Sequence, residues 1–491
     1  MMEIVTLVAV IFACFGGLLF GYDIGIIGGV LVMKPFHKEF NLTDENSAEL
    51  SGNIVSLLQA GCFFGALSVQ LIADTLGRKL SILISALVFV IGGLLQTIAS
   101  TNLGLIYSGR LIAGIGLGAV SMLVPMYVAE IARKENRGRL GCLWQLFIVI
   151  GIAISYWTNY IVIRHIPETE NLQWRIPLGL QMVPGVLLFL GMIFMPRSPR
   201  WLCSQDRIDD ARKSLAKLRH SLPDDPAILA EIDMIRESIE EERKTASSWR
   251  EIFMVRVNRR RLIVGLLLQS FQQFTGTNVI NYYTPTILKS IGLDSTETDL
   301  LATGLYGMVK ILITFICIAF LIEPVGRKPL LWSGALIMMA SMFIVGTSVK
   351  FANLNPETTG TISAAGYVGI AGVYLFAFGY SYSWGPIVWV LTSEIFPNRI
   401  RAKCVSLTTA INWFFNAIIG RFSPILLKKI GFGLYYIFGS FAVLMFLFTV
   451  FFVPETKGRS LEEMDELFGS HSEQIQQVLE EGSGKPVSVA K

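Results

Sequence analysis

Long apolar runs separated by shorter polar segments make up most of the chain. A helix needs about 20 largely apolar residues to cross roughly 30 Å of hydrocarbon. Twelve runs of about this length are present, near residues 4–32, 50–73, 80–99, 104–129, 140–162, 176–195, 262–288, 301–322, 330–349, 363–392, 404–426 and 432–453. The pattern predicts an all-α polytopic membrane protein with twelve transmembrane helices.

The polar stretches divide these runs into two sets of six. We predict an N-terminal six-helix half at 1–195, a linker at 196–261, a C-terminal six-helix half at 262–453 and a tail at 454–491. Charged residues lie on most faces of the helices expected in the linker. Such a pattern is typical of short solvated helices rather than of a separate catalytic domain.

Composition and charge set the orientation. The chain is 53% hydrophobic and only 16% charged, with a net charge of +4. Lys and Arg are concentrated in alternate loops, and the side that holds most of them faces the cytoplasm. Both termini are therefore predicted to be cytoplasmic, and the loop 33–49 to be outside. That loop contains Asn41-Leu42-Thr43, so Asn41 is a candidate glycosylation site.

No pattern typical of catalysis or metal binding is present. The six cysteines lack metal-ligand or CxxC spacing, and the four histidines are dispersed in polar segments. The glycines near 109–118 lie inside an apolar run, where close helix packing is their expected role. We expect no metal, no cofactor, no nucleic-acid partner and no enzymatic activity.

Two internal repeats relate the halves, and one of them matches residues 130–139, after the fourth run, with residues 394–401, after the tenth. Residues 71–79 follow the second run and residues 321–328 follow the eighth, and each segment contains an acid and a Gly-Arg-Lys turn. Homologous halves around a pseudo-two-fold axis are the plan of many secondary transporters. We predict that acid–arginine pairs join the cytoplasmic sides of the halves and separate when an inner gate opens. The residues concerned are Asp74, Arg78, Glu130, Arg137, Arg139, Glu323, Arg327, Glu394 and Arg399.

Further motifs accompany the repeats, namely PMYVAEI at 125–131, PRSPRWL at 196–202, QQFTGTN at 272–278, SEIFP at 393–397 and PETKG at 454–458. Together they resemble the sugar porter family of the major facilitator superfamily over nearly the whole chain. The sequence looks most like the fungal members, which include carriers of hexoses, pentoses, quinate or sugar acids. The resemblance implies the major facilitator fold, alternating access and a place in the plasma membrane.

Asp23 lies inside the first apolar run. A charged side chain at the centre of a membrane helix costs about 2.5–3.5 kcal/mol on insertion scales, so it indicates a function or a partner. Arg110, at the start of the fourth run, is the natural cation. In the resembling proton symporters an Asp at this position takes up the coupling proton, and passive glucose facilitators have Asn there. The alternative is a static Asp23–Arg110 ion pair that only orients helices.

Amide side chains suit polyol ligands because each one both donates and accepts hydrogen bonds. The resemblance assigns sugar contacts to Gln145, Gln272, Gln273, Asn278, Trp389 and Asn412. A regular helix would not align Gln272, Gln273 and Asn278, so we expect unwinding near 275–277. Helix–helix hydrogen bonding is the alternative role for these amides. Tyr282 and Tyr283 are candidate outer-gate aromatics, or else tyrosines of the interfacial belt.

Lys310 lies well inside the eighth run, where neutral-sugar porters tend to have Asn. A buried ammonium aimed at the cleft would pair with a substrate carboxylate, as in quinate or a uronic acid. Alternatively, it extends to an interface or pairs with an acid of the protein.

The function predicted from these residues is proton-coupled transport of a monosaccharide, a polyol or a sugar acid. The expected partners are the solute, protons and the lipid bilayer. A passive facilitator and a non-transporting nutrient sensor on the same fold are the alternatives. The short tail after Pro454, which has no repeated motif, disfavours the sensor.

Overall fold

The computed structural model describes residues 4–43, 45–133, 137–244, 249–282, 296–354 and 364–457, and the regular elements in these ranges are helices. The first bundle contains α1 (Ile4–Val30), α3 (Ser47–Leu76), α4 (Arg78–Thr97), α5 (Leu103–Ile131), α6 (Arg137–His165) and the pair α7 (Leu172–Leu180) and α8 (Met182–Phe194). A short helix, α2 (Lys34–Glu39), lies between α1 and α3.

The second bundle repeats this arrangement. It contains α13 (Arg256–Phe274), α15 (Thr296–Ile316), α17 (Arg327–Leu354), the pair α18 (Ala364–Tyr382) and α19 (Pro386–Glu394), α20 (Asn398–Ile430) and α21 (Gly433–Phe452). A π-helical turn, Cys317–Leu321, and α16 (Ile322–Val325) extend α15. The two bundles are joined by α9 (Pro199–Ser204), α10 (Ile208–Arg219), α11 (Pro226–Lys244) and α12 (Trp249–Met254).

Eleven spans in the described ranges are long and apolar enough to cross a membrane. The seventh predicted span, α13, fails that criterion because it carries four arginines near its start and three glutamines near its end. Its place in the second bundle matches that of α1 in the first. The predicted all-α polytopic fold of twelve spans is confirmed.

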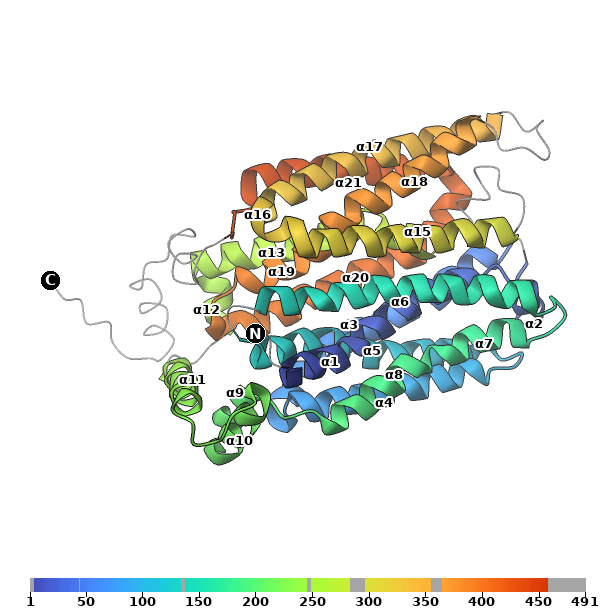
Figure 1. Cartoon of the computed structure of the whole chain (residues 1–491). Helices are drawn as coiled ribbons and strands as arrows, with labels where there is room; N and C mark the ends of the chain where they lie inside the picture. The colour runs from blue at the N-terminus through green and yellow to red at the C-terminus, as the bar shows by residue number, and fades with distance from the viewer. Residues whose placement is uncertain are drawn as a thin grey trace.

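The helices run between two ends of the bundle. The linker helices α9–α12 and the start of α1 lie at one end, and α2 lies at the other (Figure 1). We call these the linker end and the far end. The helices between them show large apolar side chains on their outer surface, such as Leu71, Phe194 and Phe451. This is the surface that a bilayer would cover.

Close packing of α5 depends on small residues, as the sequence indicated. A β-carbon on Gly116 would lie 2.5 Å from the carbonyl oxygen of Ser85 on α4, and β-carbons on Gly114 and Gly118 would meet the backbone of α3. The glycines therefore let three helices approach one another closely, as expected for membrane bundles.

Each bundle has a sharp turn at the linker end. Gly77, between α3 and α4, has φ +84°, and Gly326, between α16 and α17, has φ +94°, a region that favours glycine. The indole nitrogen of Trp201 donates to the carbonyl of Asp74 beside the first turn. The carboxylate of Glu455 accepts from the backbone N–H groups at the start of α17, beside the second turn. The segment that follows each bundle's sixth span thus holds that bundle's own turn.

Candidate functional site

Asp23 of α1 and Arg110 of α5 form a fully buried ion pair. Arg110 Nη1 donates to Asp23 Oδ1 at 3.0 Å, and both side chains are 0% exposed. Arg110 Nε donates to the carbonyl of Ile54 on α3 at 3.0 Å. Asp23 Oδ2 and Arg110 Nη2 are buried with no hydrogen-bond partner among the residues described. The pair predicted from the sequence is present, and part of its bonding capacity is unused.

The predicted break near 275–277 is also present. α13 ends at Phe274, Gly276 has φ +83°, and a helix resumes at Thr277. A β-carbon on Gly276 would lie 2.9 Å from Phe438 and from Met342, so neighbouring side chains also exclude a larger residue there. The break turns the segment after it, and this brings Gln273 and Asn278 together although they are five residues apart.

A continuous polar row follows from this turn. Asn278 Nδ2 donates to Gln273 Oε1 at 2.6 Å, and Asn281 Nδ2 donates to Asn278 Oδ1 at 3.4 Å. Lys310 Nζ on α15 donates to Asn281 Oδ1 at 3.1 Å. All four side chains are buried. The row therefore begins at Gln273 of α13 and ends at the ammonium group of Lys310 on α15.

A second amide cluster joins α13 to α20. Asn412 Nδ2 lies 2.7 Å from Gln269 Oε1 and 2.8 Å from Gln272 Oε1. Gln272 Nε2 donates to the carbonyl of Trp384 at 2.8 Å. In this structure Gln272 and Asn412 thus make the helix–helix hydrogen bonds that were the alternative to ligand binding.

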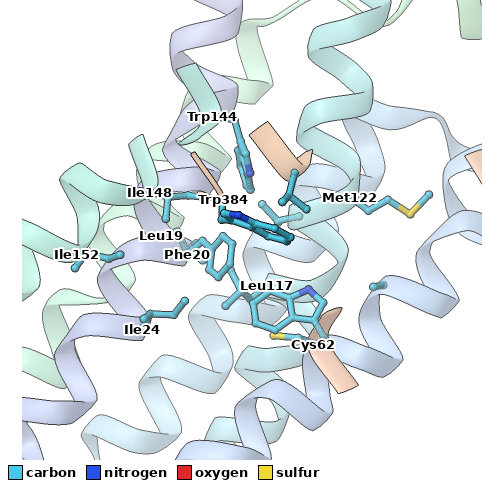
Figure 2. Close-up of a cluster of buried hydrophobic side chains, with 14 of the residues drawn as sticks. Leu19, Phe20, Ile24, Cys62, Leu117, Met122, Trp144, Ile148, Ile152 and Trp384 are labelled. Atoms are coloured by element: carbon cyan, nitrogen blue, oxygen red, sulfur yellow. The ribbon is translucent and has the colours of Figure 1, made fainter. Parts of the chain in front are cut away.

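The remaining predicted contacts differ in their surroundings. Gln145 on α6 is buried, yet it forms no hydrogen bond with the residues that the structure describes. Trp389 on α19 is only half-buried, whereas Trp384 is fully buried. Figure 2 shows Trp384 in a cluster with Phe20 and Trp144.

The two bundles meet along a seam that contains the polar row. Tyr156 of α6 donates its hydroxyl to the carbonyl of Asn281 at 3.0 Å. Gln59 of α3 donates to the hydroxyl of Tyr282 at 2.8 Å, and this hydroxyl donates to Asn416 of α20 at 3.1 Å. Nearer the far end, Arg421 pairs with Glu49 at 3.3 Å. Deeper in the molecule, Trp413 Nε1 donates to Ser121 Oγ at 3.2 Å.

Tyr282 is 1% exposed and lies in this seam rather than in an interfacial belt. Its neighbour Tyr283, the other candidate gate residue, lies outside the described residues. Asn41, the candidate glycosylation site, is exposed between α2 and α3 at the far end. Its modification stays a prediction.

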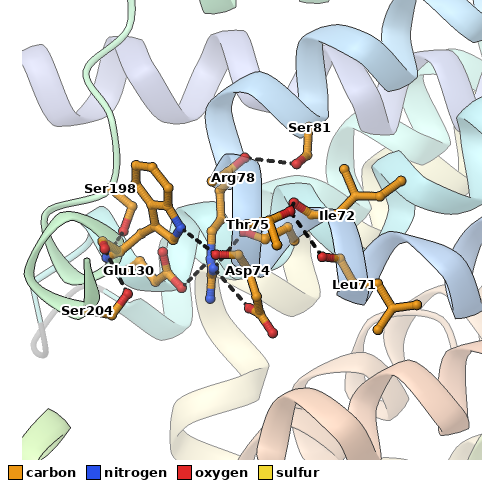
Figure 3. Close-up of polar contacts among 12 residues, drawn as sticks. Leu71, Ile72, Asp74, Thr75, Arg78, Ser81, Glu130, Ser198 and Ser204 are labelled. Carbon is orange, nitrogen blue, oxygen red and sulfur yellow. Dashed lines mark hydrogen bonds and ion pairs between the residues drawn. The ribbon is translucent and has the colours of Figure 1, made fainter.

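The predicted acid–arginine pairs form two similar clusters. Arg78 pairs with Glu130 at 2.9 Å and with Asp74 at 3.2 Å (Figure 3). The equivalent contacts occur in the second bundle, where Arg327 pairs with Glu394 at 3.0 Å and with Glu323 at 3.6 Å. The pseudo-symmetry read from the repeats therefore extends to individual ion pairs.

These clusters correct one expectation. Each joins helices of a single bundle, so among the described side chains they do not connect the two halves as predicted. A motif repeated in each half encodes contacts inside that half, because its partners are repeated with it. Arg139 is exposed and has no ion pair with the described residues. The side chains of Arg137 and Arg399 lie outside what the structure describes.

Sequence reasoning missed several members of the site. Asn281 lies one helical turn after Asn278, a spacing that could have marked it. Gln59, Tyr156, Trp384 and Asn416 carry no local signal, because only the packing of distant helices brings them to the seam.

Comparison with known proteins decides the family. A sequence profile described as "Sugar (and other) transporter" matches residues 9–468. The chain belongs to this transporter family. It is a transporter and not an enzyme, and its fold is the major facilitator fold.

Two relatives are permeases of fungi. The quinate permease of Emericella nidulans is 37% identical over 483 residues, covering 95% of this chain and 90% of the relative. A probable quinate permease of Neosartorya fischeri is 37% identical over 468 residues, covering 93% of this chain and 86% of the relative.

Solved structures of the transporter XylE are also similar. The proton:xylose symporter XylE bound to 6-bromo-6-deoxy-D-glucose superposes with a TM-score of 0.78 at 30% identity, covering 94% of this chain and 99% of that one. A partially occluded inward open conformation of XylE from E. coli gives a TM-score of 0.77 at 30% identity, covering 93% and 99%.

Proposed function

We propose that this transporter couples the movement of a polyhydroxylated solute, a sugar or a related polyol or sugar acid, to the movement of a proton. The observation that carries the proposal is the buried Asp23–Arg110 pair of the first bundle, together with the buried, hydrogen-bonded amide side chains of the second bundle. The naming of XylE as a proton:xylose symporter, at 30% identity over 94% of this chain, supports the coupling.

Asp23 supplies the proton-binding group in this mechanism. Burial favours the neutral carboxyl, and the adjacent guanidinium favours the carboxylate, so the two effects oppose each other at this position. When Asp23 is protonated, the charge attraction that joins α1 to α5 is lost. Arg110 then keeps its hydrogen bond to the carbonyl of Ile54. Protonation thus loosens α1 without releasing the arginine from α3.

The amide side chains supply the solute contacts. Gln145 has no hydrogen-bond partner among the described residues. Gln273 and Asn278, which are both buried, can exchange the hydrogen bond between them for bonds to the solute. Gln272 and Asn412 reach a ligand by exchanging the hydrogen bonds that they make in this structure. Such exchange keeps buried polar groups satisfied in both states, which limits its cost. The aromatic cluster around Trp384 can cover the C–H face of the solute.

Movement of the two bundles against each other gives access from alternate sides. The contacts that must break at the far end join the bundles directly: Tyr156 with Asn281, Gln59 with Tyr282 and Glu49 with Arg421. The two arginine clusters at the linker end stay within their bundles and stabilise each one as it moves. We place the linker end in the cytoplasm, because the linker-side loops are positively charged. The resemblance to plasma-membrane sugar porters is the ground for placing the protein in the plasma membrane.

The energy of one proton is enough for concentration of the solute. A charge moved through 100 mV provides about 2.3 kcal/mol, and one pH unit adds about 1.4 kcal/mol. Coupling to one proton therefore supports a gradient of roughly a few hundred-fold for a neutral solute.

Labelled uptake into proteoliposomes, with and without an inward proton gradient, tests the proposal. Glucose, xylose, galacturonate and quinate are the solutes to compare. The wild type should accumulate at least one of them above equilibrium. Asp23→Asn should lose this accumulation and keep exchange, because the amide retains the shape of the site but cannot take up the proton. Asp233→Asn, which changes an exposed acid of α11 in the same way, should behave as the wild type.

Other outcomes would select the alternatives. Uptake that only equilibrates, with or without the proton gradient, would identify a passive facilitator and make Asp23 a structural residue. Binding of a solute without flux would identify a sensor. Accumulation by Asp23→Asn at the wild-type level would show that the proton is bound elsewhere.

A further inference from the structure

The middle of α15 holds a buried lysine with no anionic partner among the described residues. Lys310 is 1% exposed and lies nine residues from Leu301 and fifteen from Val325, the ends of its span. These separations correspond to about 14 and 22 Å along a helix. The side chain therefore does not extend to an interface, which was one of its two alternative roles.

Among the described residues, Lys310 contacts only neutral groups. Its ammonium donates to Asn281 Oδ1 and lies 5.4 and 5.3 Å from the ring centroids of Tyr306 and Tyr380. Pairing with an acid of the protein, the other alternative, is not found among the described residues. An ammonium group has three N–H donors, and the described partners use one of them. Two donors are therefore available to a ligand.

Asn281 cannot balance this charge. Its side-chain oxygen already accepts from Lys310 and, at 3.4 Å, from the hydroxyl of Tyr306, so both lone pairs are engaged. The rings of Tyr306 and Tyr380 stabilise a cation only modestly compared with a carboxylate. A positive charge at this depth is costly, and such residues in membrane spans are commonly paired or functional.

The position of Lys310 relates it to the solute site. It ends the polar row that begins at Gln273, so a ligand held by Gln273 and Asn278 would have the ammonium group on its Asn281 side. We infer that Lys310 is the receptor for a carboxylate of the transported solute, and that this transporter prefers a carboxylated polyol to a neutral sugar. This inference rests on the proposed function and specifies its substrate class.

The same geometry connects occupancy to the seam. Asn281 accepts from Lys310 through its side chain and from Tyr156 of the opposite bundle through its backbone carbonyl. A carboxylate that binds the two unused donors of Lys310 pulls on the same ammonium group that Asn281 holds. Binding of the carboxylate therefore affects Asn281, which directly precedes Tyr282, a contact between the two bundles.

The test compares acids with neutral analogues of the same shape. Binding of quinate and its methyl ester, and of galacturonate and galactose, is measured in purified full-length transporter by tryptophan fluorescence. The wild type should prefer the acid of at least one pair. Lys310→Met should weaken binding of that acid about 10- to 100-fold and change that of its neutral partner less than about threefold. Lys350→Met, which removes an exposed lysine of the same bundle, should change neither.

Three results would overturn the inference. They are equal binding of acid and neutral analogue by the wild type, unchanged acid binding in Lys310→Met, and a proportional loss of both ligands in that variant, which is the signature of a structural role. If Lys310→Met does not fold, the inference is decided by the acid preference of the wild type and of Lys310→Arg. Lys310→Arg should retain the preference for the acid over its neutral analogue. Preference for the acid without proton-driven accumulation would reject the coupling and leave this inference intact. Proton-driven accumulation without preference for the acid would reject only this inference.

Discussion

Gly52 tests whether contact between the bundles at the far end controls access to the site. It lies on α3, and a β-carbon there would lie 2.5 Å from the backbone carbonyl oxygen of Arg421 on α20. Ordinary van der Waals contact begins at 3.4 Å, so Gly52→Ala requires a separation of about 0.9 Å between two helix backbones. Neither backbone can relieve the contact by rotating a side chain.

The displacement would also weaken a bond across the seam. Arg421 donates to the carbonyl of Glu49 at 3.4 Å and pairs with its carboxylate at 3.3 Å, and both contacts would exceed hydrogen-bonding range. Overpacking costs about 1–3 kcal/mol. In alternating access this penalty applies only to the state closed at the far end, so the open state should gain about 5- to 150-fold in relative population.

Spin labels at Thr169→Cys and Lys350→Cys, exposed positions at the far end of the two bundles, can measure this population. The six native cysteines are buried, and their labelling is checked in the protein without the added cysteines. Gly52→Ala should move the distance distribution toward longer values. Gly141→Ala is the matched control, because a β-carbon there meets nothing within 4 Å. Distributions identical in Gly52→Ala and Gly141→Ala would refute the reasoning.

Three further predictions concern other parts of the structure. Gly276→Ala should lower stability by roughly 1–3 kcal/mol relative to Gly141→Ala, because it strains a residue with φ +83° and overpacks Phe438; thermal unfolding in detergent measures this. Glu455→Gln should cost about 0.3–1 kcal/mol in the same assay, because it removes a negative charge from the N-terminus of α17; a melting temperature equal to wild type would contradict it. Burial raises the pKa of the Cys203 thiol to about 11, so little thiolate exists at neutral pH. Alkylation of Cys203 should therefore be slow at pH 7 and accelerate as the pH approaches 11, and rapid labelling at pH 7 would contradict the burial.

Much of the fold was predictable because its signals are local. A run of about 20 apolar residues is sufficient to predict a span. The break at Gly276 followed from the need to bring Gln273 and Asn278 together and from the residue types between them. α13 shows the limit of this reasoning, since its arginines and glutamines lower its hydropathy below that of the other spans.

The partners of the site residues were less predictable. The sequence offered Trp389 as an aromatic contact, but the buried indole near the glutamines is Trp384, five residues earlier. Which tryptophan turns inward depends on the break between α18 and α19, which no local rule specifies. Likewise, the sequence identified Lys310 as unusual but did not indicate Asn281 as its partner, because that contact joins two separate spans.

The way in which each bundle holds its own turn has a consequence for the continuity of the chain. Trp201 contacts the turn at Gly77, and Glu455 contacts the turn at Gly326. In each bundle, the contact that stabilises the turn therefore comes from the segment that follows the same bundle. A gene cut between the codons for α11 and α12 would therefore encode two fragments, each of which contains the residue that stabilises its own turn. When co-expressed, the two fragments would be able to assemble into one transporter. A cut before Trp201 would instead leave the first fragment without the tryptophan that stabilises its turn.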